Sequence, residues 1–157
     1  MSSIATSLSP DAGAEIVDAL TQGVADLAVE TMKAQNYHWN VKGMAFGPLH
    51  ELFQKIYEDH FEAQDELAER VKQLGAHAEG RLSTLLSRAR IEECDGHLDA
   101  AGMIAKLRDD QRALSGQMTA LAELAENHGD LVTNDMAIAR AATHDKFAWM
   151  LAAHLEG

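Results

Sequence analysis

The sequence is poor in the residues that break helices or crosslink a chain. Only two prolines, Pro10 and Pro48, occur among 157 residues, so no proline interrupts the chain after position 48. The single cysteine, Cys94, excludes an intrachain disulfide and a cysteine-rich metal cluster. Valine and isoleucine number six each, against 27 alanines and 18 leucines, a balance that favours helix over sheet. We therefore predict an all-α protein of one compact domain.

Basic residues are also scarce, which limits the partners of the protein. Thirteen lysines and arginines stand against 25 acidic residues, giving a formal net charge of −12, and none precedes Lys33 or follows Lys146. Such a chain repels nucleic acid and anionic lipid and attracts cations. There is no apolar run of membrane-spanning length and no positively charged start typical of a signal peptide. We expect a cytoplasmic protein without membrane contact.

Helical periodicity divides the chain into four long helices and a short one. Four helices of such length make a four-helix bundle the simplest architecture. The connection between the second and third long helices, about 23 residues, is long enough to cross the bundle from end to end, although a disordered loop would look the same in the sequence. The expected long helices cover about 11–40, 48–74, 99–126 and 131–155, and the short helix covers about 82–88.

Metal-binding side chains gather in one part of the chain. His38 and His50 lie at the junction of the first two expected helices, and Asp65 and Glu69 share one face of the second. Imidazole and carboxylate groups together suit Fe²⁺, and also Zn²⁺ or Co²⁺ as surrogates. A di-iron site with Glu-x-x-His on two helices of one chain is excluded, because no histidine follows a glutamate at this spacing.

The spacing of these four residues indicates a site shared by two chains. His50 and Asp65 are fifteen residues apart on one helix, which is roughly 22 Å at the rise of an α-helix. A straight helix cannot bring both to one metal. If the helix packs antiparallel against its copy across a two-fold axis, His50 of one chain lies beside Asp65 and Glu69 of the other. This arrangement predicts two equivalent sites per dimer.

These residues also carry a family resemblance that extends over essentially the whole chain. The run Tyr37-His38-Trp39-Asn40-Val41, then Leu49-His50, then Asp65-x-x-Ala68-Glu69-Arg70 resembles the Dps-type mini-ferritins. The resemblance implies a ferritin-like four-helix bundle with a short helix in its long connection. It implies one such domain over 11–157, after a short tail over 1–10. It also implies assembly into a hollow homododecamer with 23 symmetry.

The resemblance implies a ferroxidase that stores iron and protects DNA from oxidative damage. Members oxidise Fe²⁺ with hydrogen peroxide or dioxygen and keep the ferric mineral in the cavity. By this resemblance, His38 and His50 bind iron from one subunit. Asp65 and Glu69 bind it from the neighbour across the two-fold interface. Trp39 is expected near the metal, where it intercepts oxidising equivalents.

The resemblance implies two further sites, for iron uptake and for mineral growth. Asp130 and Asp135 match positions that line an acidic pore at the three-fold axes; the alternative is that they only stabilise the positive end of the last helix. Glu51 is expected at the inner surface as a nucleation site. Among the remaining histidines, we expect His60 in the core and His144 at the surface.

Two other functions stay open on the sequence. One is a nucleoid-compacting DNA-binding protein with secondary iron chemistry, but the lysine-rich tails that many Dps proteins use for DNA are missing. We therefore expect no direct DNA binding; a saturable mobility shift at physiological salt would contradict this. The other is a helical interaction module without metal, which would run as a monomer or dimer rather than as a shell of roughly 205 kDa.

Overall fold

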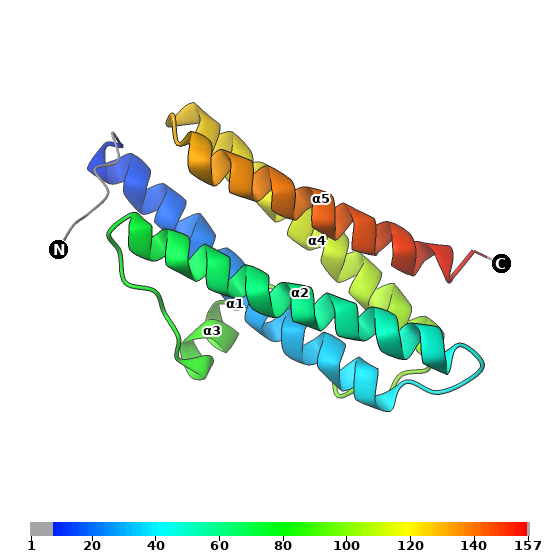
Figure 1. Cartoon of the computed structure of the whole chain (residues 1–157). Coiled ribbons are helices and arrows are strands. Elements are labelled where there is room, and N and C mark those ends of the chain that lie inside the picture. The colour runs from blue at the N-terminus through cyan, green and yellow to red at the C-terminus, as the bar shows by residue number, and fades with distance from the viewer. Residues whose placement is uncertain (1–7, 157) are drawn as a thin grey trace.

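A computed structural model describes residues 8–156 of the chain (Figure 1). This part of the chain has five helices and no strand, which confirms the all-α prediction. None of these helices combines the length and the apolar character needed to cross a membrane. The helices are α1 (Pro10–Asn40), α2 (Phe46–Gln73), α3 (Leu82–Arg88), α4 (Ala100–Asn127) and α5 (Leu131–Ala153).

The helices begin and end where local chemistry favours it. Ser9 and Asp99 cap α1 and α4, each accepting a backbone N–H of the first turn with its side chain. Gly75 and Gly129 follow α2 and α4 with φ of +89° and +77°, a left-handed conformation that glycine adopts without strain. Most of the tail expected over residues 1–10 lies outside the described residues, and α1 already begins at Pro10.

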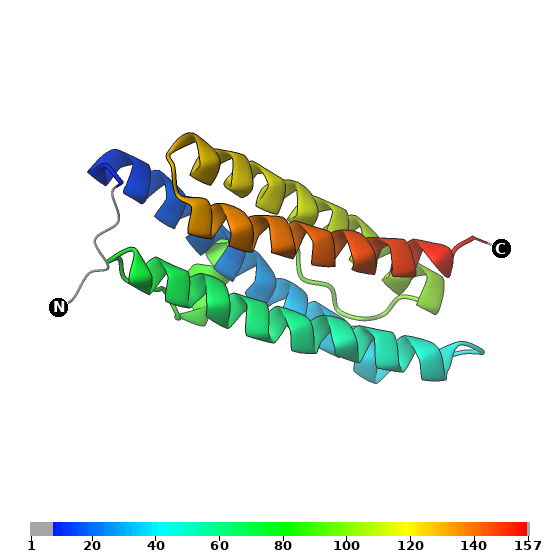
Figure 2. The ribbon, with the colours of Figure 1, turned by 45° about the horizontal axis from the view of Figure 1, so that its top comes forward.

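The long helices form two antiparallel pairs, α1 with α2 and α4 with α5 (Figure 1). The connection from α2 to α4 carries α3 beside α1 and runs from one end of the bundle to the other (Figures 1 and 2). This is the predicted crossover, and because of it α2 and α4 run parallel. The chain therefore folds as a four-helix bundle with a short helix in its long connection.

A buried polar layer crosses the middle of the bundle between two apolar clusters. One cluster includes Leu20 and Leu67, the other Phe53 and Leu107. Each long helix contributes a buried polar side chain to this layer. These are Glu30 of α1, His60 of α2, Gln111 of α4 and His144 of α5.

Gln111 holds this polar layer together. Its Nε2 donates to Nε2 of His60 at 2.9 Å and to a carboxyl oxygen of Glu30 at 3.1 Å, and its Oε1 accepts from Nδ1 of His144 at 2.8 Å. The core position expected for His60 is confirmed, whereas the surface position expected for His144 is wrong. The side chain of His144 is 1% exposed, because its face of α5 packs inward.

Both histidines of the layer are held in the neutral state. Nε2 of His60 accepts from Gln111, and Nε2 of His144 accepts from Arg140 at 3.4 Å. An amide N–H₂ and a guanidinium can only donate. A proton on either Nε2 would therefore place one donor against another in the dry centre of the bundle.

We expect the free energy of unfolding to fall as the pH drops below about 6.5, the pKa of histidine in an unfolded chain. Burial lowers the pKa of His60 in the folded protein, and burial with nearby positive charge lowers the pKa of His144 to about 2. Below pH ~6.5 the unfolded chain binds more protons than the folded one, so acid favours unfolding. Glu30 opposes this trend, because burial raises its pKa and the folded state then holds its proton above the usual carboxyl range.

Thermal unfolding at several pH values between about 7.5 and 5 tests this expectation. The variant His144→Gln keeps a polar, neutral side chain and should lose Tm less steeply with acid than the wild type. His97→Gln alters an exposed histidine and serves as the matched control, with the wild-type slope. Equal slopes in all three proteins would contradict the role of the polar layer.

Candidate metal site

His38 and His50 lie face to face where α1 ends and α2 begins. Their rings are stacked, with centroids 3.7 Å apart and planes 15° from parallel. Nδ1 of His38 donates to the carbonyl oxygen of His50 at 2.7 Å, and Nδ1 of His50 donates to the carbonyl oxygen of His38 at 2.8 Å. The short turn between the two helices thus brings together two residues that are twelve apart in the sequence.

These reciprocal hydrogen bonds prepare both rings for a metal. A carbonyl oxygen only accepts, so each Nδ1 carries the hydrogen, and each Nε2 of a neutral ring keeps its lone pair. Fixing the second nitrogen of a histidine in this way is how proteins orient a metal ligand. Tyr57 supports His38 edge-on, with centroids 5.3 Å apart, and Phe46 stacks on His50 at 5.0 Å.

The two candidate carboxylates lie far along α2 from this pair. Asp65 and Glu69 are exposed, and neither forms a hydrogen bond or ion pair within residues 8–156. In the same range, no group of three or more histidine, cysteine, aspartate or glutamate side chains is close enough to hold a metal ion. One chain therefore brings together the two histidines but not the carboxylates. The completion of the site by a second chain stays a prediction.

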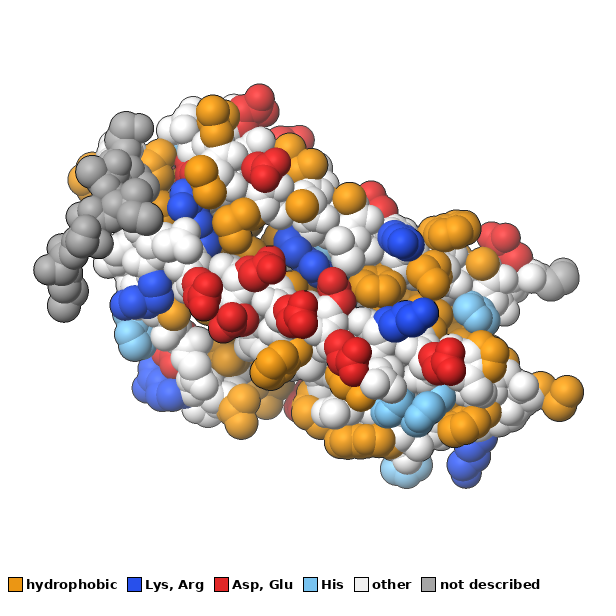
Figure 3. Space-filling model, viewed as in Figure 1, with side chains coloured by type: hydrophobic (Ala, Val, Ile, Leu, Met, Phe, Trp, Pro, Cys, Tyr) orange, Lys and Arg blue, Asp and Glu red, His pale blue; other side chains and the backbone are white. Residues whose placement is uncertain are grey.

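Several large hydrophobic side chains on α1, α2, α3 and the turn between α1 and α2 are exposed, some of them next to the histidine pair. Trp39, the residue expected to intercept oxidising equivalents, is 60% exposed next to His38 in the sequence, and Phe61 on α2 is 67% exposed. Figure 3 shows hydrophobic side chains beside histidines at the end of the bundle where α2 begins. Large apolar groups in water are typical of surfaces that contact another protein. Others of this kind are Met32, Met44, Phe46, Leu82 and Leu86.

Carboxylates line the exposed side of α2. Figure 3 shows acidic side chains gathered along this helix. Glu51, the candidate nucleation residue, is one of these exposed carboxylates. Nearby, Nε2 of Gln54 donates a hydrogen bond to Oε1 of Glu58 at 2.8 Å. Such a surface attracts cations. The other exposed carboxylates of α2 are Glu58, Glu62, Asp65, Glu66 and Glu69.

The two candidate pore residues differ in their surroundings. Asp130 is 6% exposed, caps α5 by accepting from the Thr133 N–H at 3.0 Å, and pairs with Arg70 at 2.8 Å. Burial alone would raise the pKa of Asp130, but the hydrogen bonds from Thr133 and the charge of Arg70 outweigh it and lower the pKa. Asp135 is exposed and forms no such contact within the described chain. The geometry of Asp130 is that of a structural ion pair, whereas Asp135 is available to solvent.

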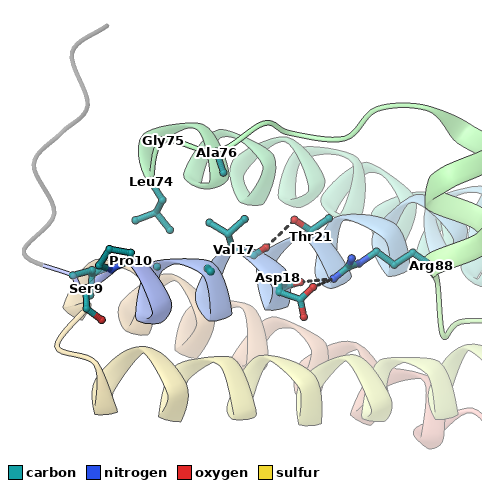
Figure 4. Close-up of a pocket in the computed structure, with 12 residues that line it drawn as sticks. Ser9, Pro10, Val17, Asp18, Thr21, Leu74, Gly75, Ala76 and Arg88 are labelled. Carbon is teal, nitrogen blue, oxygen red and sulfur yellow. Dashed lines mark hydrogen bonds and ion pairs between the residues drawn. The ribbon is translucent and has the colours of Figure 1, made fainter.

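A pocket of about 540 Å³ lies at the opposite end of the bundle, between the start of α1 and the end of α2 (Figure 4). It is lined mainly by small and apolar residues, with an ion pair between Arg88 and Asp18 at its edge. It contains no histidine and a single carboxylate. This pocket therefore lacks the ligands of a metal centre, and the histidine pair remains the candidate.

Known proteins resemble this chain in both fold and sequence. Residues 17–157 match the ferritin-like domain family. The DNA protection during starvation protein of Helicobacter pylori is 37% identical over 132 residues, which cover 83% of this chain and 92% of that protein. A Dps protein from Bacillus brevis has a TM-score of 0.91 at 34% identity, covering 95% of this chain and 100% of that chain.

A Dps protein from Vibrio cholerae O1 has a TM-score of 0.92 at 31% identity, covering 99% of this chain and 98% of that chain. It is described as a member of a broad superfamily of ferritin-like diiron-carboxylate proteins. The bundle with its long crossover connection thus defines a ferritin-like domain. Since Dps proteins are among its relatives at 34–37% identity over most of the chain, the chain belongs to the Dps group of the ferritin-like family.

Proposed function

We propose that this protein is an iron-storing and iron-detoxifying ferroxidase whose active sites are shared by two subunits. Iron is its substrate, with Zn²⁺ or Co²⁺ as surrogates. The stacked pair of His38 and His50, each with its Nε2 free and its Nδ1 held by a carbonyl, is the observation that carries the proposal. Asp65 and Glu69 of a two-fold neighbour would complete the ligand set, since within one chain Asp65 lies roughly 22 Å from His50 along the helix and Glu69 lies one turn farther.

In this proposal the two histidines bind and orient ferrous iron, and the carboxylates neutralise its charge. Two ferrous ions held together supply both electrons that break the O–O bond of hydrogen peroxide. Ferric iron and hydroxide then form without release of a hydroxyl radical. Dioxygen is the alternative oxidant. Trp39 would donate an electron to any oxidising species that escapes this paired reaction.

The proposed particle is a homododecamer with 23 symmetry that holds the ferric mineral inside. The exposed carboxylate of Asp135 would attract iron at a pore near the start of α5, and Asp130 would act there chiefly through the ion pair that fixes the helix. Glu51 would nucleate mineral on the inner surface. With a formal net charge of −12 per chain, protection of DNA would come from removing iron and peroxide rather than from binding DNA.

Stopped-flow oxidation of added Fe²⁺, with peroxide and with dioxygen, tests this function. We expect saturable oxidation well above the rate in protein-free buffer, by a particle of roughly 205 kDa in size-exclusion chromatography with light scattering. Oxidation no faster than in buffer, or a protein that stays a monomer or dimer, would contradict the proposal.

A further inference from the structure

Glu30 lies at the centre of the bundle without a positively charged partner. It is 0% exposed and forms no ion pair within residues 8–156. Its Oε1 accepts one hydrogen bond, from Nε2 of Gln111 at 3.1 Å, and its Oε2 has no hydrogen-bond partner in the described chain. A buried carboxylate with neither a countercharge nor several donors is so costly that such a group takes up a proton instead.

Asp26, one turn earlier in α1, has the donors that Glu30 lacks. It is also 0% exposed. Its Oδ1 accepts from the backbone N–H of Arg90 at 2.6 Å and of Ile91 at 3.3 Å, and its Oδ2 accepts from Nε2 of Gln22 at 3.2 Å. Three N–H donors suit an ionised carboxylate, whereas Glu30 has a single neutral amide. The two buried acids of α1 therefore have different environments.

The ammonium group of Lys33, three residues after Glu30, is engaged by other residues. Its Nζ lies 2.7 Å from Oδ2 of Asp110 on α4 and donates to the carbonyl oxygen of Glu92 at 2.9 Å. Asp110 directly precedes Gln111, so this second carboxylate is on the same turn of α4 as the amide that contacts Glu30. This part of the contact between α1 and α4 thus holds two carboxyl groups and one ammonium group.

The other two long helices bring no free positive charge to Glu30. His60 of α2 and His144 of α5 are neutral, because Nε2 of each accepts a hydrogen bond. Arg140 of α5 contacts His144 and is paired with Asp59 at 2.8 Å. A proton is therefore the remaining means of neutralising Glu30.

We propose that Glu30 is a neutral carboxylic acid at neutral pH and that its proton locks α1 against α4. The side chain then accepts from Gln111 with Oε1 and carries the proton on Oε2. Burial and the charge of Asp110 raise the pKa of Glu30, and the opposing charge of Lys33 is a smaller effect. Removal of the proton leaves two carboxylates to share one ammonium group in a dry contact. This loosens the attachment of α1 to α4 and to the segment at Glu92.

Infrared spectroscopy of the metal-free protein in D₂O tests the protonation directly, because a protonated carboxyl group absorbs at a higher frequency than an amide or an ionised carboxylate. We expect this band at neutral pH in the wild type and none in Glu30→Gln. Glutamine keeps the acceptor and supplies an N–H in place of the O–H, so this variant should fold. Glu126→Gln removes an exposed acid of α4 and should keep the band. No band in the wild type, or a band that persists in Glu30→Gln, would overturn the proposal.

The pH dependence of Tm in the metal-free protein tests the lock. Between about pH 4.3, the pKa of glutamate in an unfolded chain, and the higher pKa of Glu30 in the folded protein, folding takes up one proton at this site. The stability that this site supplies therefore falls as the pH rises. Glu30→Gln takes up no proton, so its Tm should rise relative to the wild type by roughly 3–5 °C from about pH 6.5 to 7.5. Glu126→Gln should follow the wild type. A Tm difference between the wild type and Glu30→Gln that stays constant with pH would contradict the proposal.

Discussion

Replacing His50 with alanine is expected to lower the initial rate of ferrous oxidation by about 100-fold or more. Loss of a group that merely orients a metal ligand already costs about 10- to 100-fold, and here a ligand itself is removed. The variant also removes the ring that stacks on His38, with the two ring centroids 3.7 Å apart. Stopped-flow absorbance of ferric iron, at matched protein and iron concentrations, measures the rate.

Lys55→Ala is the matched control for this variant. Lys55 is exposed on the same helix, just over a turn beyond His50, and forms no ion pair within the described residues. It should oxidise iron at the wild-type rate. Both variants should keep the wild-type particle size, since neither side chain belongs to the apolar clusters. A His50→Ala protein that is correctly assembled and as fast as the wild type would exclude His50 from the site.

Replacing Asp130 with alanine is expected to lower the free energy of unfolding by about 3 kcal/mol or more. Breaking one side of a buried ion pair costs about 3–5 kcal/mol, and here the guanidinium of Arg70, 2.8 Å away, would remain buried without its carboxylate. The cap of α5 is lost as well. For a chain of this length, Tm should fall by roughly 6–12 °C. Differential scanning calorimetry measures the change.

The variant Asp135→Ala tests iron uptake at the start of α5 without the loss of stability that we expect for Asp130→Ala. Asp135 is exposed, so its removal should leave Tm within about 2 °C of the wild type. If Asp135 lines the pore, the variant should take up added iron into mineral more slowly. An unchanged uptake rate would exclude Asp135 from the pore, and an unchanged Tm in Asp130→Ala would contradict the role of the ion pair.

The sequence predicts the helices of this fold well because local signals mark their ends. The short helix over 82–88 and the start of the last helix at Leu131 match the structure, and α5 ends at Ala153 rather than at 155. Helix stops depend on glycines such as Gly75 and Gly129, whose conformational freedom can be read from the sequence. The crossover was predicted because the connection between the second and third long helices, about 23 residues, is long enough to run the length of the bundle.

The arrangement of the core was harder to predict, because it depends on contacts between distant residues. His144 was misplaced since α5 is rich in alanine on all sides, and its periodicity hides the face that packs inward. The ion pair between Asp130 and Arg70 was not predicted, because the two residues are 60 positions apart in the sequence. No local pattern reveals such a pair.

Residue types and their spacing predicted which side chains belong to the candidate metal site. They did not predict the geometry of the histidine pair. The sequence brings His38 and His50 together through a short turn. Only the structure shows that each ring donates to the carbonyl of the other residue, which fixes both tautomers. Support from Tyr57 and Phe46 was also missed, although both are aromatic residues within two helical turns of His50.

The shared site is tested most directly by assembling His50→Ala and Asp65→Ala subunits together. In a mixed two-fold pair, one site lacks both groups, and the other combines His50 of one chain with Asp65 of its neighbour and is intact. Random mixing makes half of the pairs mixed, so about a quarter of the wild-type oxidation rate should return. Each variant assembled alone should remain inactive. Mixed particles no more active than either variant alone would show that the two residues do not meet across chains.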